Sequence, residues 1–324
     1  MSHTTDEAPL PVPPYVGNGP YCYTNSLLTV LGGEAPTPGV VETLTSSAFG
    51  FQLLAGRIPL FDPYGWDPDH GLDQALRLLG YSWRRVTSDS ATQALTALRD
   101  RVAEGPVLIG PVDMGLLAHQ PGSDRASGAD HFVVALDVTP SDVVFHDPQG
   151  HPWARLPHDL FCEAWRAEDI GYAKGRYAMR VALERQQPVG VVHALSASLT
   201  EAAQWLSGRE LPVPPGTLGG AEGLDRLADQ VGDRSELGVL DMLSRFSIPI
   251  GARRRADAAA CMSLIGAHGV ARVLHQSARE LGGLQYPARI HDTHAVSAGL
   301  RRLAGMHHEL VAAVTRHPWT DGTP

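Results

Sequence analysis

The stretch HFVVALDVTPSDVVFHDPQG, residues 131–150, decides the fold. Two apolar runs of strand length flank Thr139-Pro140-Ser141-Asp142, and a proline with Ser and Asp beside it favours a turn, so we predict a β-hairpin. His131 begins its first strand, and Asp147 ends the second. Counting outward from the turn places residue 131 opposite about residue 150, so a bulge or a diagonal reach is needed to bring Asp147 to His131.

A second stretch, YCYTNSL at residues 21–27, places a cysteine after a Gly-Pro pair and at the head of an apolar run. The apolar residues recur at helical spacing as far as Leu31, and two glycines follow, which predicts a helix that ends there. The positive end of a helix favours a thiolate over a thiol. A cysteine taken alone is more often a small buried hydrophobic residue, so it is the position of Cys22 that favours a nucleophile.

These two stretches together suggest a catalytic site. A histidine at a strand start can take the proton of a thiol, and a carboxylate at the end of the adjacent strand can orient the imidazole ring. Cys22, His131 and Asp147 fit these three roles. Each residue alone also has a structural explanation, and their joint order and spacing are what favour catalysis.

The rest of the chain divides into four parts, in agreement with a length of 324 residues, which favours two domains. We expect an extended Pro-rich lead-in at residues 1–14 and a domain of mixed helices and strands at 15–183. A linker at 184–195 and an all-helical domain without convincing strands at 196–324 follow. In the mixed domain we expect helices at 68–79, 90–104 and 156–168 and strands at 81–86, 105–112 and 176–183. In the last domain we expect helices at 220–246, 254–283 and 292–315, with breaks at Ile248-Pro249 and Gly282-Gly283.

Composition excludes several classes of protein. Hydrophobic residues make up 43% of the chain and charged residues 19%, as in an ordinary folded protein. A formal charge of -9 and the lack of a basic block beyond Arg253-Arg254-Arg255 argue against a nucleic-acid partner. The sequence shows neither a secretion signal nor an apolar run of about eighteen residues, so we expect a cytoplasmic protein without membrane contact. Three widely spaced cysteines suggest neither a disulfide framework nor a zinc site, and we expect no metal and no cofactor.

Other polar clusters are weaker candidates. Two histidine-rich segments of the helical domain, residues 291–294 and 307–309, are read as solvated helix faces rather than metal ligands. An acidic cluster at residues 62–70 could bind an amine, but turns and helix capping already explain it. The loop before His131 carries Asp113, His119 and Asp124, which could border a cleft and to which the sequence assigns no partner.

The Cys22 segment and the His-strand-turn-strand-Asp-Pro-x-Gly element resemble the papain-like fold shared by bacteriocin-processing cysteine peptidases and the amino-terminal domain of the butirosin biosynthesis acyltransferase. The similarity spans about residues 15–183, and the helical tail resembles the second domain of the butirosin-type proteins. It implies an α+β fold with an antiparallel sheet, an N-terminal helix that carries the cysteine, and an all-helical domain after it. It also implies Cys22 as nucleophile, His131 as general base and then acid, and Asp147 as the residue that orients His131.

The chain departs from this family at the oxyanion site. Papain-like enzymes usually place a glutamine several residues before the nucleophile, whereas here Asn18 is the only carboxamide in that region. The backbone amide of Cys22 would be the second donor to the oxyanion. Asn18 is equally well explained as a turn residue between glycines. Tyr21 and Asn25 are further candidates close to the site.

The resemblance implies transfer of an acyl or aminoacyl group from a carrier-protein thioester, through a thioester on Cys22, to a small-molecule amine or another nucleophile in natural-product (antibiotic) biosynthesis. Release of a chain by cyclisation would use the same residues. Two alternatives stay open, a cytoplasmic cysteine peptidase or amidase and a non-catalytic binding module. The helical domain could bind the acceptor or form a homodimer, and the sequence does not separate these roles.

Overall fold

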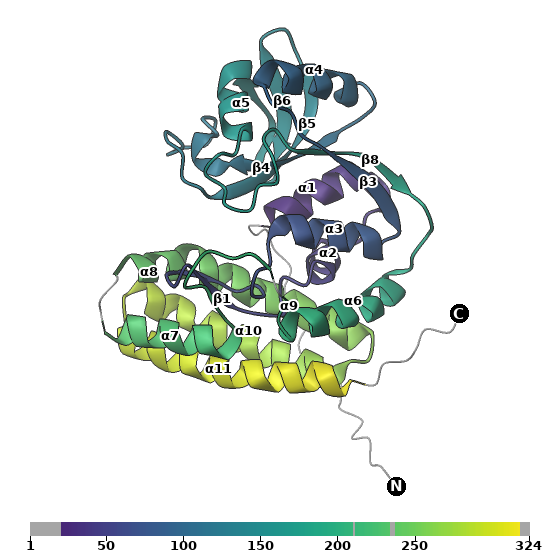
Figure 1. Cartoon of the computed structure of the whole chain (residues 1–324). Coiled ribbons are helices and arrows are strands. Elements are labelled where there is room, and N and C mark those ends of the chain that lie inside the picture. Colours follow the sequence, from purple (N-terminus) through teal and green to yellow (C-terminus); the bar gives the residue numbers. More distant parts are fainter. Residues whose placement is uncertain (1–20, 210, 234–236, 318–324) are drawn as a thin grey trace. The chain divides into compact units, whose positions relative to one another are not determined.

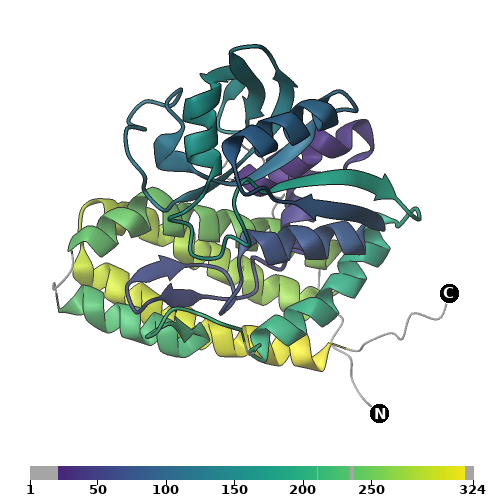
Figure 2. The same ribbon diagram turned by 45° about the horizontal axis from the view of Figure 1, so that its top comes forward.

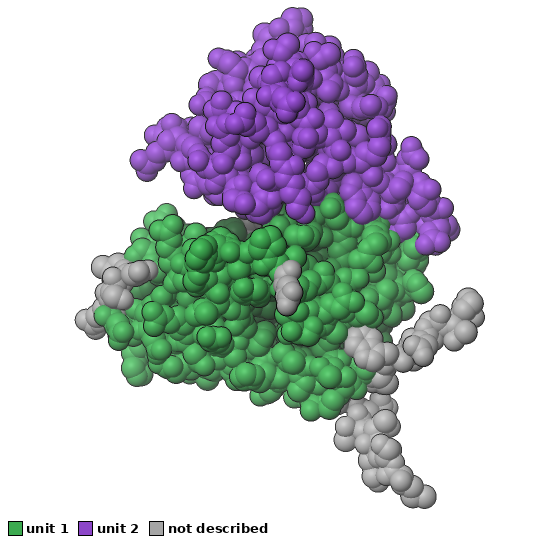
Figure 3. Space-filling model, viewed as in Figure 1, with its two compact units in different colours: residues 1–18, 39–78, 189–324 green, residues 19–38, 79–188 purple. Residues whose placement is uncertain are grey.

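A computed structural model describes residues 21–209, 211–233 and 237–317 (Figure 1). The fold is of the α+β class, with antiparallel sheets and a helical C-terminal region, as predicted from the sequence. The chain forms two compact units, which Figure 3 distinguishes by colour. Among the described residues, unit 1 comprises 39–78 and the chain from 189 onward, and unit 2 comprises 21–38 and 79–188.

Unit 2 is built on a six-stranded antiparallel sheet in the order β3-β8-β4-β5-β6-β7. The strands are β3 (Tyr81–Val86), β4 (Val107–Asp113), β5 (Asp130–Val138), β6 (Asp142–Asp147), β7 (His151–Pro157) and β8 (Met179–Arg185). Its helices are α1 (Cys22–Leu31), α4 (Ala91–Val102) and α5 (His158–Trp165), with short 3-10 turns at Gly32–Glu34 and Met114–Leu116. The predicted strands of this part are thus confirmed, and β7 was not predicted.

Helices cover both faces of the unit 2 sheet. The ring of Phe132 in β5 meets Tyr23 of α1 edge-on, with 6.1 Å between the ring centroids. The next residue, Val133, belongs to an apolar core that includes Leu98 of α4 and Phe161 of α5. Because successive side chains of a strand point to opposite faces, α1 lies on one face of β5 and the core with α4 and α5 lies on the other.

The predicted hairpin forms, and its register explains how its two ends meet. Val138 is opposite Val143 next to the turn, but the pairing shifts by one residue around Leu136, so that Val134 is opposite His146. This bulge leaves Asp147 level with residue 133, and His131 becomes its diagonal neighbour on the same face. The bulge and the diagonal reach expected from the sequence are both present.

Unit 1 combines helices with a small antiparallel sheet in the order β2-β1-β9. The strands are β1 (Gln52–Leu54), β2 (Ile58–Leu60) and β9 (Leu218–Gly219). The helices are α2 (Pro38–Leu44), α3 (Pro68–Leu78), α6 (Val191–Leu206), α7 (Gly220–Gly232), α8 (Leu237–Met242), α9 (Ile248–Leu264), α10 (His268–Arg289) and α11 (Thr293–Arg316), and a π-helical turn at Leu243–Ser247 joins α8 to α9. Figures 1 and 2 show α11 running alongside α7 and α10.

A buried ionic network ties the 39–78 segment to the C-terminal helices. Arg254 of α9 donates from Nε to Glu42 Oε1 at 2.9 Å and from Nη1 to Asp62 Oδ2 at 3.0 Å. Its neighbour Arg255 donates from Nη2 to the carbonyl of Gly50 at 2.8 Å. Removing one partner from such a network leaves a buried charge uncompensated, so the pairing strongly favours this one arrangement of the chain.

This division differs from the one expected from the sequence in three ways. Residues 39–78 pack with the C-terminal helices rather than with 79–183. Only residues 186–190 of the expected linker lack regular structure, because β8 ends at Arg185 and α6 begins at Val191. The helical part also contains a short strand, β9, which pairs with β1.

One expected helix break is wrong. Gly282 and Gly283 lie inside α10, where a Cβ at either position would meet open space. The break occurs instead around Gly266, whose φ of 75° ends α9 before α10 begins at His268. Two adjacent glycines weaken a helix but do not end it when packing on both sides holds the backbone.

No helix in the described part of the chain is both long enough and apolar enough to cross a membrane.

Candidate functional site

Asp147, at the end of β6, is the centre of a buried polar cluster in unit 2. Its Oδ1 accepts hydrogen bonds from His131 Nε2 at 2.8 Å and from the backbone N–H of Gln149 at 2.9 Å. Its Oδ2 accepts from His119 Nε2 at 2.8 Å and from Gln120 Nε2 at 2.5 Å. Four donors therefore surround one carboxylate that is only 3% exposed.

These contacts keep Asp147 ionised. Burial acts to raise the pKa of its carboxyl, but the hydrogen bonds from His119 and His131, the charge of His131 and the amide of Gln149 outweigh burial and hold the pKa far below its usual range. Asp147 is thus a fixed negative charge that can orient an imidazole and stabilise its protonated form.

His131 binds Asp147 through one of its two ring nitrogens. The side chain is 1% exposed, and its Nε2 is bound to Asp147. Its Nδ1 is buried and has no hydrogen-bond partner among the described residues. A buried polar atom without a partner needs an explanation, and a nearby reacting group would supply one.

Cys22 is the first residue of α1, which packs against β5 in the same unit. The hydroxyl of Ser26 donates to the carbonyl of Phe132 at 3.0 Å, and Tyr23 meets the ring of Phe132. Cys22 and His131 are thus each the sequence neighbour of a residue in this contact, Tyr23 and Phe132. The thiol is largely buried, at 9% exposed, and lies at the positive end of the helix.

The other two described cysteines have a different setting, and none of the three is in a disulfide. Burial, with a contribution from the charge of Asp159, raises the pKa of the Cys162 thiol to about 11. Burial also raises the pKa of Cys261 to about 11, where the charge of Asp257 adds to it and a hydrogen bond with Thr43 opposes it. Both remain protonated at neutral pH and are poor nucleophiles.

Asp113 holds the loop that delivers the second histidine. This carboxylate, 2% exposed at the end of β4, accepts hydrogen bonds from the amides of Gly115, Ser127 and Gly128 and from the Ser127 hydroxyl, at 2.9 to 3.1 Å. The loop between these residues carries His119, whose ring also meets Phe145 and His151 edge-on, with centroid distances of 5.0 and 5.2 Å. Asp113 therefore shapes the loop.

The remaining candidates have these positions. Asn18 lies outside the described residues. Tyr21 is fully buried and accepts the amide of Asn25 at its carbonyl, and Asn25 is half-buried on α1, one turn after Cys22. Asp124 is exposed on the loop, away from the hydrogen bonds described for Asp113.

The acidic cluster at residues 62–70 has a structural role in unit 1. Asp62 pairs with Arg254, and Asp67 accepts the amide of His70 at 2.8 Å in the first turn of α3. Within the residues that the structure describes, no group of three or more His, Cys, Asp or Glu side chains is arranged to hold a metal ion.

Sequence reasoning missed Gln120 and the partner of His119. His119 and Gln120 lie in a loop without periodicity, and their spacing to Asp147 in the sequence does not indicate a contact with it. The loop position of His119 between two strands was the one available signal, and it gave no partner.

Comparison with known proteins shows that part of the helical region is similar to a known sequence family. Residues 214–315 match the family described as the YobF C-terminal domain. An uncharacterized protein YobF of Bacillus subtilis (strain 168) is 35% identical over 164 residues, which is 50% of this chain and 53% of that protein. The chain therefore spans about half the length of this relative.

Proposed function

We propose that this protein is a cysteine-dependent acyltransferase with a papain-like catalytic unit. Cys22 is its nucleophile, His131 its base and acid, and Asp147 the residue that orients His131. The observation that carries the proposal is the 2.8 Å hydrogen bond between His131 Nε2 and Asp147 Oδ1, in the unit whose first helix begins with Cys22. It leaves Nδ1 as the ring nitrogen available to a thiol.

In the proposed reaction, the Cys22 thiolate attacks the carbonyl of an acyl thioester and forms a new C–S bond. His131, protonated at Nδ1, gives this proton to the departing thiol, and an acyl-enzyme thioester results. An acceptor amine then attacks the acyl group and loses a proton to Nδ1, and the Cys22 thiolate departs as the amide forms. Asp147 stays ionised throughout and stabilises the imidazolium of each cycle.

The donor is proposed to be an acyl or aminoacyl group on a carrier protein, and the acceptor a small-molecule amine in a biosynthetic pathway. Resemblance to the butirosin-type acyltransferases supports this assignment. The backbone amide of Cys22 and the carboxamide of Asn18 are the proposed donors to the oxyanion.

Intact-protein mass spectrometry tests the proposal. Wild-type protein, Cys22→Ala and Cys162→Ala are each incubated with acylated carrier proteins and simple thioesters. We expect the mass of the acyl group to appear on the wild type and on Cys162→Ala, and to be absent from Cys22→Ala. An adduct that persists in Cys22→Ala would assign the nucleophile elsewhere.

A second measurement separates transfer from hydrolysis. Acyl-enzyme formed on the wild type is mixed with an amine, and the products are identified. Amide product supports an acyltransferase, whereas free acid at every amine concentration would identify a hydrolase that uses the same residues with water as acceptor.

A further inference from the structure

Unit 1 contains a pocket that the proposed chemistry does not use. Its volume is about 380 Å³, within the range of about 300–1,000 Å³ typical of small-molecule sites. Four parts of the chain line it: residues 49–51 with 63–64, the end of α6, the start of α7, and α11. All four belong to unit 1, so the pocket is complete within that unit.

One wall of the pocket is the N-terminus of α7. Residues 219–222 line it, and among the described residues no side chain caps this helix of 13 residues. Gly220 donates its amide to the carbonyl of Phe51 at 2.8 Å. The next amides of the first turn have no carbonyl within the helix to bind, because a helical N–H binds the carbonyl four residues before it. Such amides and the positive end of the helix favour an anion.

The glycine at this position is required by both conformation and space. Gly220 has a φ of 57°, in the left-handed region, and a Cβ there would lie 2.6 Å from Nε2 of His307. The imidazole of His307 thus packs directly against the start of α7.

Two buried nitrogen atoms next to the pocket have no partner among the described residues, Nη1 of Arg255 and Nδ1 of His307. His307 lines the pocket, and Arg255 is 4% exposed and bonded to Gly50, which also lines it. Burial lowers the pKa of His307 to about 4, and the charges of Arg255 and His308 contribute to this shift. The imidazole is therefore neutral at pH 7, and the cation of Arg255 lies close to it. An unpartnered buried nitrogen in a side chain that lines the pocket, His307 Nδ1, indicates a hydrogen-bonding group that the pocket would receive.

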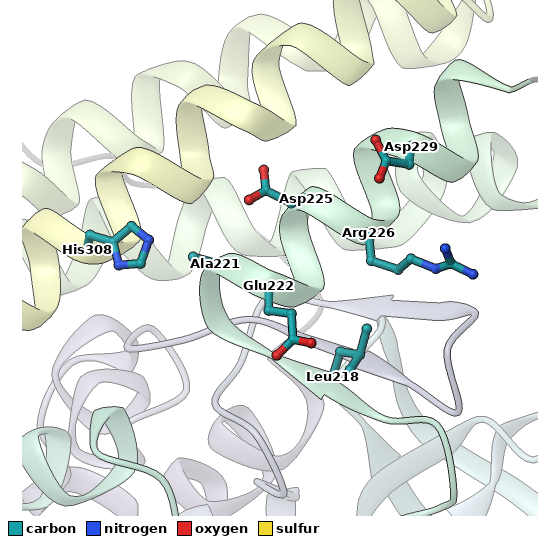
Figure 4. A pocket seen from close by; sticks show the side chains of 7 residues that line it. All are labelled: Leu218, Ala221, Glu222, Asp225, Arg226, Asp229 and His308. Atoms are coloured by element: carbon teal, nitrogen blue, oxygen red, sulfur yellow. The ribbon is translucent and has the colours of Figure 1, made fainter.

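A neighbouring hollow has the opposite character. It shares Ala221, Glu222 and His308 with the pocket, and Figure 4 shows His308 of α11 beside Ala221 while Glu222 points toward Leu218. Two carboxylates of α7, Asp225 and Asp229, line this hollow, and Asp229 is paired with Arg301 at 2.6 Å. The like charge of Glu222 at the shared edge should weaken the binding of an anion.

We propose that the pocket binds a small organic anion, namely a carboxylate or a phosphate ester on an aromatic or aliphatic body. Its anionic oxygens accept hydrogen bonds from the first-turn amides of α7 and from His307 Nδ1–H, and the nearby charge of Arg255 favours an anion. Its apolar body lies against Tyr64 and Val311 at the pocket wall. The residues of this site belong to unit 1, whereas Cys22 belongs to unit 2, and the inference does not depend on the proposed acyl transfer.

Calorimetric titration of the full chain with four matched probes tests the proposal. Benzoate and phenyl phosphate carry the two anionic groups, and benzyl alcohol and benzylamine present the same body without a negative charge. We expect saturable binding of at least one anion, and the stronger of the two identifies the preferred group. Failure of both anions to bind, or equal binding of benzyl alcohol, would overturn the proposal.

Variants then locate the site. Glu222→Gln, on an exposed residue, should tighten binding of the anion by about twofold to fivefold, whereas Glu184→Gln, a matched exposed charge of unit 2, should leave it unchanged. His307→Leu should weaken binding by about tenfold or more, and His307→Asn, which places an N–H near the position of Nδ1, should recover part of it. Equal affinities for wild type, Glu222→Gln and His307→Leu would place the anion elsewhere on the protein, and each melting temperature confirms that the variant is folded.

Discussion

Replacement of Asp147 by Asn should destabilise unit 2 strongly. The substitution keeps the shape of the side chain but turns one carboxylate oxygen into an NH2 group. Both oxygens accept from two donors each, His131 and Gln149 on one side and His119 and Gln120 on the other. Whichever way the amide is turned, its NH2 replaces an oxygen that accepts two hydrogen bonds in the wild type.

The size of the effect follows from burial and charge. A hydrogen bond to a charged group contributes about 1.5–3 kcal/mol, and removing one partner from a buried charged pair costs about 3–5 kcal/mol. We therefore expect Asp147→Asn to lower the free energy of unfolding by about 3–5 kcal/mol at pH 7. Asp124→Asn, on the same loop but exposed, should change it by less than about 0.5 kcal/mol.

The pH dependence gives the sign of the effect. The pKa of Asp147 is lowered in the folded protein, so its contribution is complete above the unfolded value of about 3.9 and is lost as the pH falls toward the folded pKa. The difference in stability between wild type and Asp147→Asn should therefore be constant near neutral pH and shrink below about pH 4.

Urea unfolding followed by circular dichroism at several pH values measures both quantities. A difference below about 1 kcal/mol at pH 7 would refute the buried hydrogen-bonded carboxylate, because loss of even one such bond exceeds it. A difference that stays constant down to pH 3 would refute the lowered pKa.

Three further perturbations test other parts of the structure. Iodoacetamide should modify Cys22 in the folded protein and Cys162 only after unfolding, because the pKa of Cys162 is about 11. Peptide mass spectrometry measures the modification of each cysteine, and labelling of Cys162 in the folded protein would contradict its burial. Arg254→Met removes the cation that pairs with two buried carboxylates and should destabilise unit 1 by about 3–5 kcal/mol in urea unfolding, and an unchanged midpoint would argue against the network. Gly251→Ala, whose Cβ would meet an aromatic ring at 2.7 Å, should cost about 1–3 kcal/mol, whereas Gly282→Ala, in open space, should be neutral or stabilising, and thermal melts that rank the two in reverse would contradict the packing.

The hairpin and the first helix were predictable because their signals are local. Apolar runs of strand length and turn residues defined the strands that end at Asp147 and begin at His131, and the count of residues outward from the turn showed that a bulge or diagonal reach was needed. The register shift around Leu136 supplies it. The start of α1 at Cys22 likewise followed from apolar spacing and the glycines after Leu31.

The division of the chain was not predictable in the same way. Residues 39–78 join unit 1 through contacts such as Arg254 with Glu42 and Asp62, which lie about 190 to 210 positions apart in the sequence and leave no periodic pattern. The hydrogen bonds of His119 and Gln120 with Asp147 depend on the path of a loop that Asp113 holds. Local sequence propensity therefore does not indicate these hydrogen bonds.

The pH dependence of Cys22 alkylation shows whether Cys22 and His131 act as one unit, as we propose. The rate of modification is followed by mass spectrometry from pH 4 to 9 in wild type and in His131→Ala. We expect Cys22 of the wild type to react at pH values well below the usual thiol pKa of about 8.5, and His131→Ala to move the profile up toward that value. Superimposable profiles would show that His131 does not influence the thiol, and would contradict the account.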